Sequence, residues 1–308
     1  MEYWKILVIV IVPSLAILGT ISFLDTSDIE TISPKNTVVE VSEDSIPLRI
    51  GTVHRDAQKM IERFQPSADY LAKNLSDYTT KYHGKVIITK TPMEMEILLK
   101  QQEIDLFYDS PLITYSISEN SGSVPFLISW KENVENYHSV FFVKSTSMID
   151  SLDDFGGKTI AFQSPDSTTG YLLPVSHLSQ NGLSLGDDAN SLRFVFSYDD
   201  ENTPNLVIDG KADIGVTSNI DFEDFPEGIK SQLVIVEKTI DVPRYIVSHR
   251  SELNSDTVSK IRSILLEMNQ DSEGKKILED FKETKKYSEL ENTEKFTEQM
   301  RELYKIIQ

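Results

Sequence analysis

From Pro47 onward the sequence alternates short apolar runs of strand type with amphipathic stretches of helical period, in two successive series. Such alternation is typical of a mainly parallel sheet with helices on both faces. Strands are expected over 48–53, 85–90 and 104–108 in the first series, and over 159–162, 194–197 and 214–217 in the second. Helices expected over 255–269, 272–281 and 293–307 then return to the first series. The pattern therefore predicts an α/β protein with two lobes and a cleft between them.

Helix starts in the first series carry clear signals. Pro66 suits the first turn of a helix expected over 65–78, and Thr91-Pro92-Met93-Glu94 has the sequence of a capping box. Ser110-Pro111 opens a further helix. Together with the three expected strands, these helix starts predict the order β-α-β-α-β-α for the first series.

The part of the chain before the first strand divides into an apolar and an acidic segment. Residues 6–24 form an almost unbroken apolar run of about 19 residues, near the length that spans a bilayer. Lys5 precedes the run and acidic residues follow it, which favours an N-terminus inside the cell and the remainder outside. We expect residues 1–24 to be an uncleaved single-pass anchor in the cell membrane and 25–46 to be a flexible acidic tether. The lobes are expected over 47–147 with 239–308, and over 148–238.

Composition excludes several classes of function. The net charge of −19 argues against nucleic acid or an anionic membrane surface as the main partner. The absence of cysteine excludes disulfides, thiolate metal sites and cysteine nucleophiles. The acidic residues at 199–201 and 221–224 lack the spacing of a calcium loop, so we interpret them as solvated acids. No set of nucleophile, base and orienting residue is visible. We expect no metal, no cofactor and no catalytic residue.

The most informative motif is Ser167-Thr168-Thr169-Gly170, which follows one predicted strand and precedes a helix expected over 171–180. Backbone N–H groups at the start of a helix have no intrahelical acceptor, and the helix dipole places partial positive charge there. Together with three hydroxyl groups, such a start suits a small tetrahedral anion such as phosphate or phosphonate. A Ser/Thr helix cap with spare hydroxyls is the alternative.

Other candidates follow from the rule that ligands bind at the carboxyl ends of strands in open α/β sheets. His54 follows the first strand, and Asp109 with Ser110 follows the third. His54 could donate to an anion or lie in a solvated loop. Tyr108 and Tyr137 could form walls of the cleft or belong to the core.

Several of these segments, in their order and spacing, resemble the phosphonate/phosphate/phosphite-binding components of ABC importers, which have the type II periplasmic-binding-protein fold. The matching segments are 66–71, 104–106, 110–111, 137–140, 151–158, 167–174 and 210–215. The resemblance implies two lobes, hinged by two strands, that close on a tetrahedral oxyanion. It implies that Ser167, Thr168 and Thr169 hold the anion, and that Tyr137, Ser139 and Ser110 occupy matching positions.

Two acids depart from the pattern of that family. Many phosphonate binders have a tyrosine or an apolar residue where this chain has Asp109, and many have a histidine near Asp199 or Asp200. A bare carboxylate repels an anion at a few ångströms. Either these acids point away from the ligand, or they hold a cationic part of it such as an amino group.

The leading functional hypothesis is a monomeric, membrane-tethered solute-binding protein that passes a phosphonate-like oxyanion to an ABC permease. Hinge closure on the ligand would then create the state that the permease recognises. The second hypothesis is an extracellular ligand-sensing domain that acts with a membrane signalling partner. The third is an enzyme on the same fold.

Overall fold

The computed structural model describes residues 44–307, apart from 132–133, 187, 200 and 282–283. The expected anchor and nearly all of the expected tether lie outside these residues, so they stay predictions. Among the described residues, no helix is both long and apolar enough to cross a membrane.

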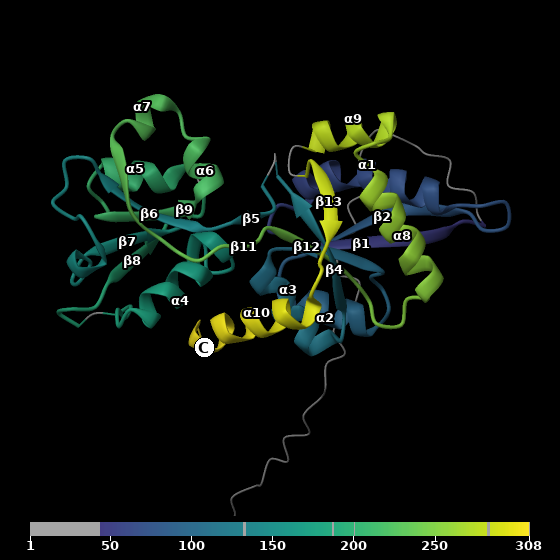
Figure 1. Cartoon of the computed structure of the whole chain (residues 1–308), viewed down its shortest axis with the longest axis horizontal. Coiled ribbons are helices and arrows are strands. Elements are labelled where there is room, and N and C mark those ends of the chain that lie inside the picture. Colours follow the sequence, from purple (N-terminus) through teal and green to yellow (C-terminus); the bar gives the residue numbers. More distant parts are fainter. Residues whose placement is uncertain (1–43, 132–133, 187, 200, 282–283, 308) are drawn as a thin grey trace, which may run out of the picture. The chain divides into compact units, whose positions relative to one another are not determined.

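The first lobe is built on a six-stranded mixed sheet with the order β13-β4-β12-β3-β1-β2 (Figure 1). Its strands are β1 (Ile46–Val53), β2 (Tyr82–Thr89), β3 (Leu106–Asp109), β4 (Val124–Trp130), β12 (Tyr245–His249) and β13 (Lys286–Glu289). The parallel arrangement expected for the first three strands is confirmed, because β1 pairs in parallel with both β2 and β3. β12 is antiparallel to its neighbours β3 and β4, and β13 is antiparallel to β4. Neither β4 nor β13 was expected from the sequence.

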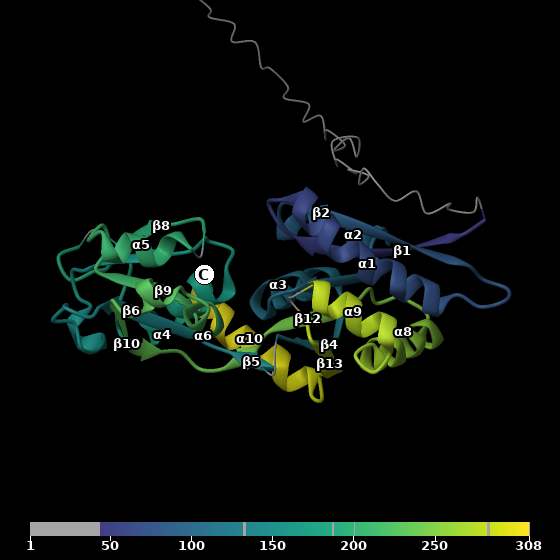
Figure 2. The same ribbon diagram turned by 90° about the horizontal axis from the view of Figure 1, so that it is seen from above.

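The described helices of this lobe are α1 (Ala57–Leu75), α2 (Pro92–Lys100), α3 (Pro111–Ser121), α8 (Ser255–Glu267), α9 (Ser272–Phe281) and α10 (Thr293–Ile307). Helices α1, α8 and α9 bury their apolar stripes in one core with the sheet, and α2 contacts α3 (Figure 2). Helix α10 contacts α3 of the same lobe and also α4 (Leu173–Gln180) of the second lobe. The capping box at Thr91 is confirmed, with Pro92 at the first helical position.

The helix expected over 65–78 begins eight residues earlier, at Ala57. Asp56 starts it, because its side chain accepts the N–H of Lys59 at 3.0 Å. Pro66 therefore lies inside the helix and not in its first turn. The buried residues Met60 and Phe64 extend the apolar stripe upstream of the proline, and this packing outweighs the preference of proline for a helix start.

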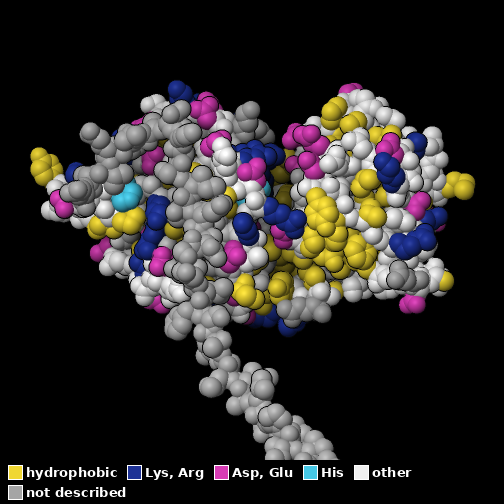
Figure 3. Space-filling view, turned by 180° about the vertical axis from the view of Figure 1, so that it is seen from behind, with side chains coloured by type: hydrophobic (Ala, Val, Ile, Leu, Met, Phe, Trp, Pro, Cys, Tyr) yellow, Lys and Arg dark blue, Asp and Glu magenta, His cyan; other side chains and the backbone are white. Residues whose placement is uncertain are grey.

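The second lobe contains a five-stranded sheet with the order β10-β6-β9-β7-β8. Its strands are β6 (Ser139–Lys144), β7 (Thr159–Phe162), β8 (Arg193–Phe196), β9 (Ile214–Ser218) and β10 (Leu233–Lys238). Its helices are a 3₁₀ turn (Leu152–Asp154), a π-helical turn (Thr168–Leu172), α4 (Leu173–Gln180), α5 (Asn202–Ile208), α6 (Asn219–Glu223) and α7 (Glu227–Lys230). Edge strand β8 leaves Phe194 and Val195 partly exposed, and Figure 3 shows apolar side chains gathered on a face of this lobe.

Two short antiparallel strands, β5 (Asn136–Tyr137) and β11 (Val242–Pro243), pair where the chain passes between the two sheets. The expected lobe boundary gives residues 139–144 to the first lobe, whereas β6 pairs with β9 and β10 of the second sheet. This strand belongs to the second sheet because its residues at 140–143 are buried between second-lobe elements. The full division of the chain into lobes stays a proposal, with β5 and β11 as the crossing strands.

Candidate functional site

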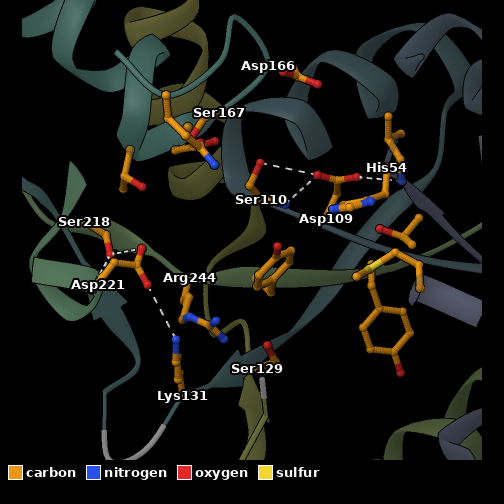
Figure 4. Close-up of a pocket in the computed structure, with 18 of the residues that line it drawn as sticks. His54, Asp109, Ser110, Ser129, Lys131, Asp166, Ser167, Ser218, Asp221 and Arg244 are labelled. Atoms are coloured by element: carbon orange, nitrogen blue, oxygen red, sulfur yellow. Dashed lines mark hydrogen bonds and ion pairs between the residues drawn. The ribbon is translucent and has the colours of Figure 1, made fainter. Parts of the chain in front are cut away.

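A cavity of about 520 Å³ lies where the carboxyl ends of strands from both sheets meet (Figure 4). From the first lobe it is lined by residues that follow β1 and β3 and by the end of β4. From the second lobe it is lined by the loop after β7 and by the start of α6. Tyr137 of the crossing strand β5, Arg244 and three residues of α1 (Met60, Arg63 and Phe64) also line it. This is the place where an open α/β sheet binds ligands.

The Ser-Thr-Thr-Gly motif forms the second-lobe wall of the cavity. The Ser167 hydroxyl accepts the N–H of Gly170 at 3.0 Å, and the Ser167 carbonyl accepts the N–H of Leu172 at 2.9 Å, which gives the turn its wide pitch. The helix continues without a break into α4. The cap predicted as the alternative is therefore present at Ser167, but it uses only one of the three hydroxyl groups.

Thr168 has the most telling side chain of the motif. It is 2% exposed and lines the cavity, and its hydroxyl has no hydrogen-bond partner among the described residues. A buried hydroxyl without a partner is costly, so such groups usually serve a ligand or an ordered water. Gly170 allows the chain to fold this tightly, since a Cβ there would lie 2.5 Å from the Cβ of Gln163.

Ser110 and Asp109 form part of the opposite wall (Figure 4). Ser110 is the N-cap of α3 with Pro111 at the first helical position, as expected, but its side chain makes no capping bond. Asp109 accepts the N–H of Val53 at 3.1 Å through Oδ2 and the N–H of Ser110 at 2.8 Å through Oδ1. The acid therefore ties the ends of β1 and β3 together and still lines the cavity.

Burial, with a smaller contribution from the negative charge of Asp166, raises the pKa of Asp109 to about 7. The two backbone N–H donors act in the opposite direction. Its carboxyl group thus exchanges its proton near neutral pH. The neighbouring His54 accepts the N–H of Asp56 at 2.9 Å through Nδ1, and burial lowers the pKa of its ring. His54 is therefore neutral at pH 7 and brings no positive charge to an anion.

Most of the side chains predicted from the sequence meet at this cavity. Those that line it are His54, Tyr108, Asp109, Ser110, Tyr137, Ser167, Thr168 and Thr169. Gly170 belongs to the motif but does not line the cavity, and Asp200 is outside the described residues. Tyr108 and Tyr137 are both buried and both line the cavity, so the two alternatives given for them are not exclusive. Whether these residues bind a ligand stays a prediction.

Sequence reasoning missed a group of polar residues at the end of the cavity near the crossing strands (Figure 4). Ser129 is 1% exposed, and its hydroxyl has no partner among the described residues. Arg244 is buried in the wall, with its guanidinium 5.0 Å from the ring of Tyr245. One feature of the sequence could have indicated Ser129 and Lys131 as site residues, because both lie at the carboxyl end of a strongly apolar strand.

Ion pairs link the two lobes across the cavity. Arg55 lies 3.6 Å from Asp166 of the second lobe. Lys131 lies 3.6 Å from Asp221, which also accepts the hydroxyl of Ser218 at 2.6 Å. Asp221, interpreted from the sequence as a solvated acid, lines the cavity and pairs with this lysine, and its side chain is still 36% exposed. Among the described residues, no cluster of three His, Asp or Glu side chains could hold a metal ion.

Comparison with known proteins gives one family and a large set of similar folds. The model of a family described as "ABC transporter, phosphonate, periplasmic substrate-binding protein" matches residues 51–294. The structure of XAC2383 from Xanthomonas citri, bound to chloride, is 24% identical with a TM-score of 0.76, covering 84% of this chain and 98% of that one.

Two further structures have the same fold. PhnD1 from Prochlorococcus marinus, in complex with methylphosphonate, is 19% identical with a TM-score of 0.64, covering 84% of this chain and 97% of that one. A binding-protein component of an ABC phosphonate transporter from Pseudomonas aeruginosa is 17% identical with a TM-score of 0.64, covering 84% and 86% of the two chains. The expected two-lobed periplasmic-binding-protein fold is thereby confirmed, while its N-terminal helix lies outside the described residues.

Proposed function

The chain belongs to the family of periplasmic substrate-binding proteins of phosphonate ABC transporters, and we propose that its cavity captures a small tetrahedral oxyanion of the phosphonate class. The single observation that carries this proposal is the buried hydroxyl of Thr168 in the cavity wall, which has no hydrogen-bond partner in the part of the chain that the structure describes. It lies at a helix start, where free N–H groups and the helix dipole favour an anion. A phosphonate oxygen would supply the missing acceptor.

The opposite wall supports the same ligand. Ser110 offers a hydroxyl that makes no capping bond, and Ser129 offers a buried hydroxyl without a partner among the described residues. Arg244 adds a guanidinium group to the wall. A tetrahedral anion can accept from several such donors at once, and contacts to both lobes favour the closed state over the open one.

The wider setting of this function is also a proposal. Residues 6–24 would anchor the protein in the cell membrane, and residues 25–46 would let the two lobes reach the permease from outside the cell. The protein would act as a monomer and release its ligand to the permease when the lobes open. Members of this family serve transport, and we propose no catalytic step.

Titration calorimetry with methylphosphonate, phosphate, phosphite and 2-aminoethylphosphonate tests the ligand class. We expect saturable binding of at least one of the four anions. The variant Ser167→Ala/Thr168→Ala should bind that anion at least about tenfold more weakly, because it loses one or two hydrogen bonds to a charged group.

Ser176→Ala is the matched control, because the Ser176 hydroxyl is buried and unpartnered among the described residues but does not line the cavity. It should leave the affinity unchanged. If none of the four anions binds to the wild-type protein, the assignment to this ligand class fails. Native mass spectrometry of the purified protein would then identify any small molecule that it retains.

A further inference from the structure

Asp109 is an unusual residue to find in the wall of an anion-binding cavity. It is 7% exposed, and each of its two carboxyl oxygens accepts one backbone N–H. These bonds hold the carboxyl group in a fixed position beside Ser110, whose hydroxyl lies 3.4 Å from Oδ1. A carboxyl oxygen that accepts one N–H retains a second site, and in the protonated group this oxygen can also donate its O–H.

Other charged groups around the cavity do not overcome the repulsion between an ionised Asp109 and an anion. The described cations that line it are Arg55, Arg63, Lys131 and Arg244, and the other described carboxylates are Asp56, Asp166 and Asp221. With Asp109 ionised, four positive charges meet four negative charges. With Asp109 neutral, the same wall carries one net positive charge.

The neutral side chains of the cavity leave this balance unchanged. Burial lowers the pKa of His54, so the ring is uncharged near pH 7. Burial raises the pKa of Tyr108 and of Tyr137, so both phenols keep their protons. Asp166 also faces Asp109 from the second lobe, and it is partly compensated by Arg55 at 3.6 Å.

Resting on the proposed function, we propose that Asp109 is protonated when the oxyanion is bound and donates its O–H to an oxygen of the ligand. The proton comes from solvent, or from the ligand if the ligand arrives as a monoanion. It stays on the carboxyl oxygen in the bound state, and it leaves again when the ligand leaves. Binding of a phosphonate dianion is therefore coupled to the uptake of one proton.

The environment of the carboxyl group supports this coupling. Burial raises the pKa of Asp109 to about 7 even before a ligand is present. A bound anion would raise the pKa further, since like charges disfavour the ionised form. The proton is therefore available at neutral pH, and affinity for a dianion should fall about tenfold for each pH unit above about pH 8.

Calorimetry with methylphosphonate in two buffers of different ionisation enthalpy measures the number of protons taken up. At about pH 8.5, where free Asp109 and the free ligand have both lost their protons, we expect about one proton per ligand for the wild-type protein. We expect none for Asp109→Asn, which cannot ionise. Asp166→Asn is the matched control: proton uptake should persist, with its midpoint shifted to lower pH because one negative charge near Asp109 is gone.

In Asp109→Asn the amide N–H₂ cannot accept a hydrogen bond, so one of the two backbone N–H groups now bound to the carboxyl group loses its acceptor and the protein could be destabilised. A second measurement therefore uses the wild-type protein alone. Infrared difference spectroscopy on addition of methylphosphonate should show the carbonyl band of a protonated carboxyl group appearing at about pH 8.5. Binding without proton uptake, uptake that persists in Asp109→Asn, or uptake without the carboxyl band would each overturn the inference and leave the proposed function standing. Absence of binding by methylphosphonate and the three other anions would overturn both.

Discussion

Thr168→Val separates a ligand-binding hydroxyl from a structural one, because the two roles predict opposite changes. Valine has nearly the shape of threonine but lacks the hydroxyl, which at Thr168 is buried and without a partner among the described residues. Removing a buried hydroxyl that makes no bond relieves a desolvation cost of about 1–3 kcal/mol. The free energy of unfolding of the ligand-free protein should therefore rise by about 1–2 kcal/mol.

The same substitution should weaken ligand binding. A hydrogen bond to a charged group is worth about 1.5–3 kcal/mol, so the dissociation constant for methylphosphonate should increase by about 10- to 150-fold. Urea unfolding without ligand measures the first effect, and titration calorimetry measures the second. Stability and affinity thus change in opposite directions at one residue.

Thr217→Val is the matched control for this prediction. Thr217 is also fully buried, and its hydroxyl has no partner among the described residues, but it does not line the cavity. It should show the gain in stability and no change in affinity. Our reasoning is refuted if Thr168→Val lowers stability and leaves affinity intact, because the hydroxyl then has only a structural role.

Three further predictions concern the motif, the core and pH. Gly170→Ala should weaken methylphosphonate binding by at least about tenfold in calorimetry, because the new Cβ would lie 2.5 Å from a side-chain carbon of the preceding loop and displace it. Asp105→Ala should lower the free energy of unfolding in urea by about 3 kcal/mol and leave the affinity for methylphosphonate unchanged. In the wild-type protein the guanidinium groups of Arg49 and Arg250 each lie 3.1 Å from the Asp105 carboxylate, and the substitution removes the partner of both. The pKa of Asp109 is raised from 3.8 to about 7, so the folded state binds the proton more tightly than the unfolded state. Its contribution to the free energy of unfolding should therefore fall as pH rises from about 4 to about 7, by about 1.4 kcal/mol per pH unit, and Asp109→Asn should remove this slope in urea titrations at several pH values.

The elements that the sequence predicted well are those whose signals are local. The capping box at Thr91 and the helix start at Ser110-Pro111 depend on residues within one turn, and both are present. The three C-terminal helices have strong apolar periodicity and agree with prediction to within two residues. Pro66 shows the limit of local reasoning, since tertiary packing of the residues before it decides where the helix begins.

The residues of the candidate site also divide into those with a local sequence signal and those brought together only by tertiary structure. The motif at Ser167 is contiguous, so its capping geometry could be predicted from the residue types alone. Ser129 and Arg244 meet at the cavity because β12 pairs with β4 in a register that places Tyr245 opposite Ser129. These residues are more than a hundred positions apart, and no signal in a single sequence specifies that register.

The ion pairs across the cavity are too weak to hold the two lobes together by themselves. The side chains of Arg55 and Asp166 are 61% and 39% exposed, and a pair of this kind contributes about 0–1 kcal/mol. The Lys131 pair is better shielded, but Asp221 is still 36% exposed at its side chain. Closure under the proposed function must therefore come mainly from the ligand, through buried donors such as Thr168 that have no other partner among the described residues. The ion pairs then orient the two lobes for closure, and raising the salt concentration should change the affinity for methylphosphonate far less than removing the Thr168 hydroxyl does.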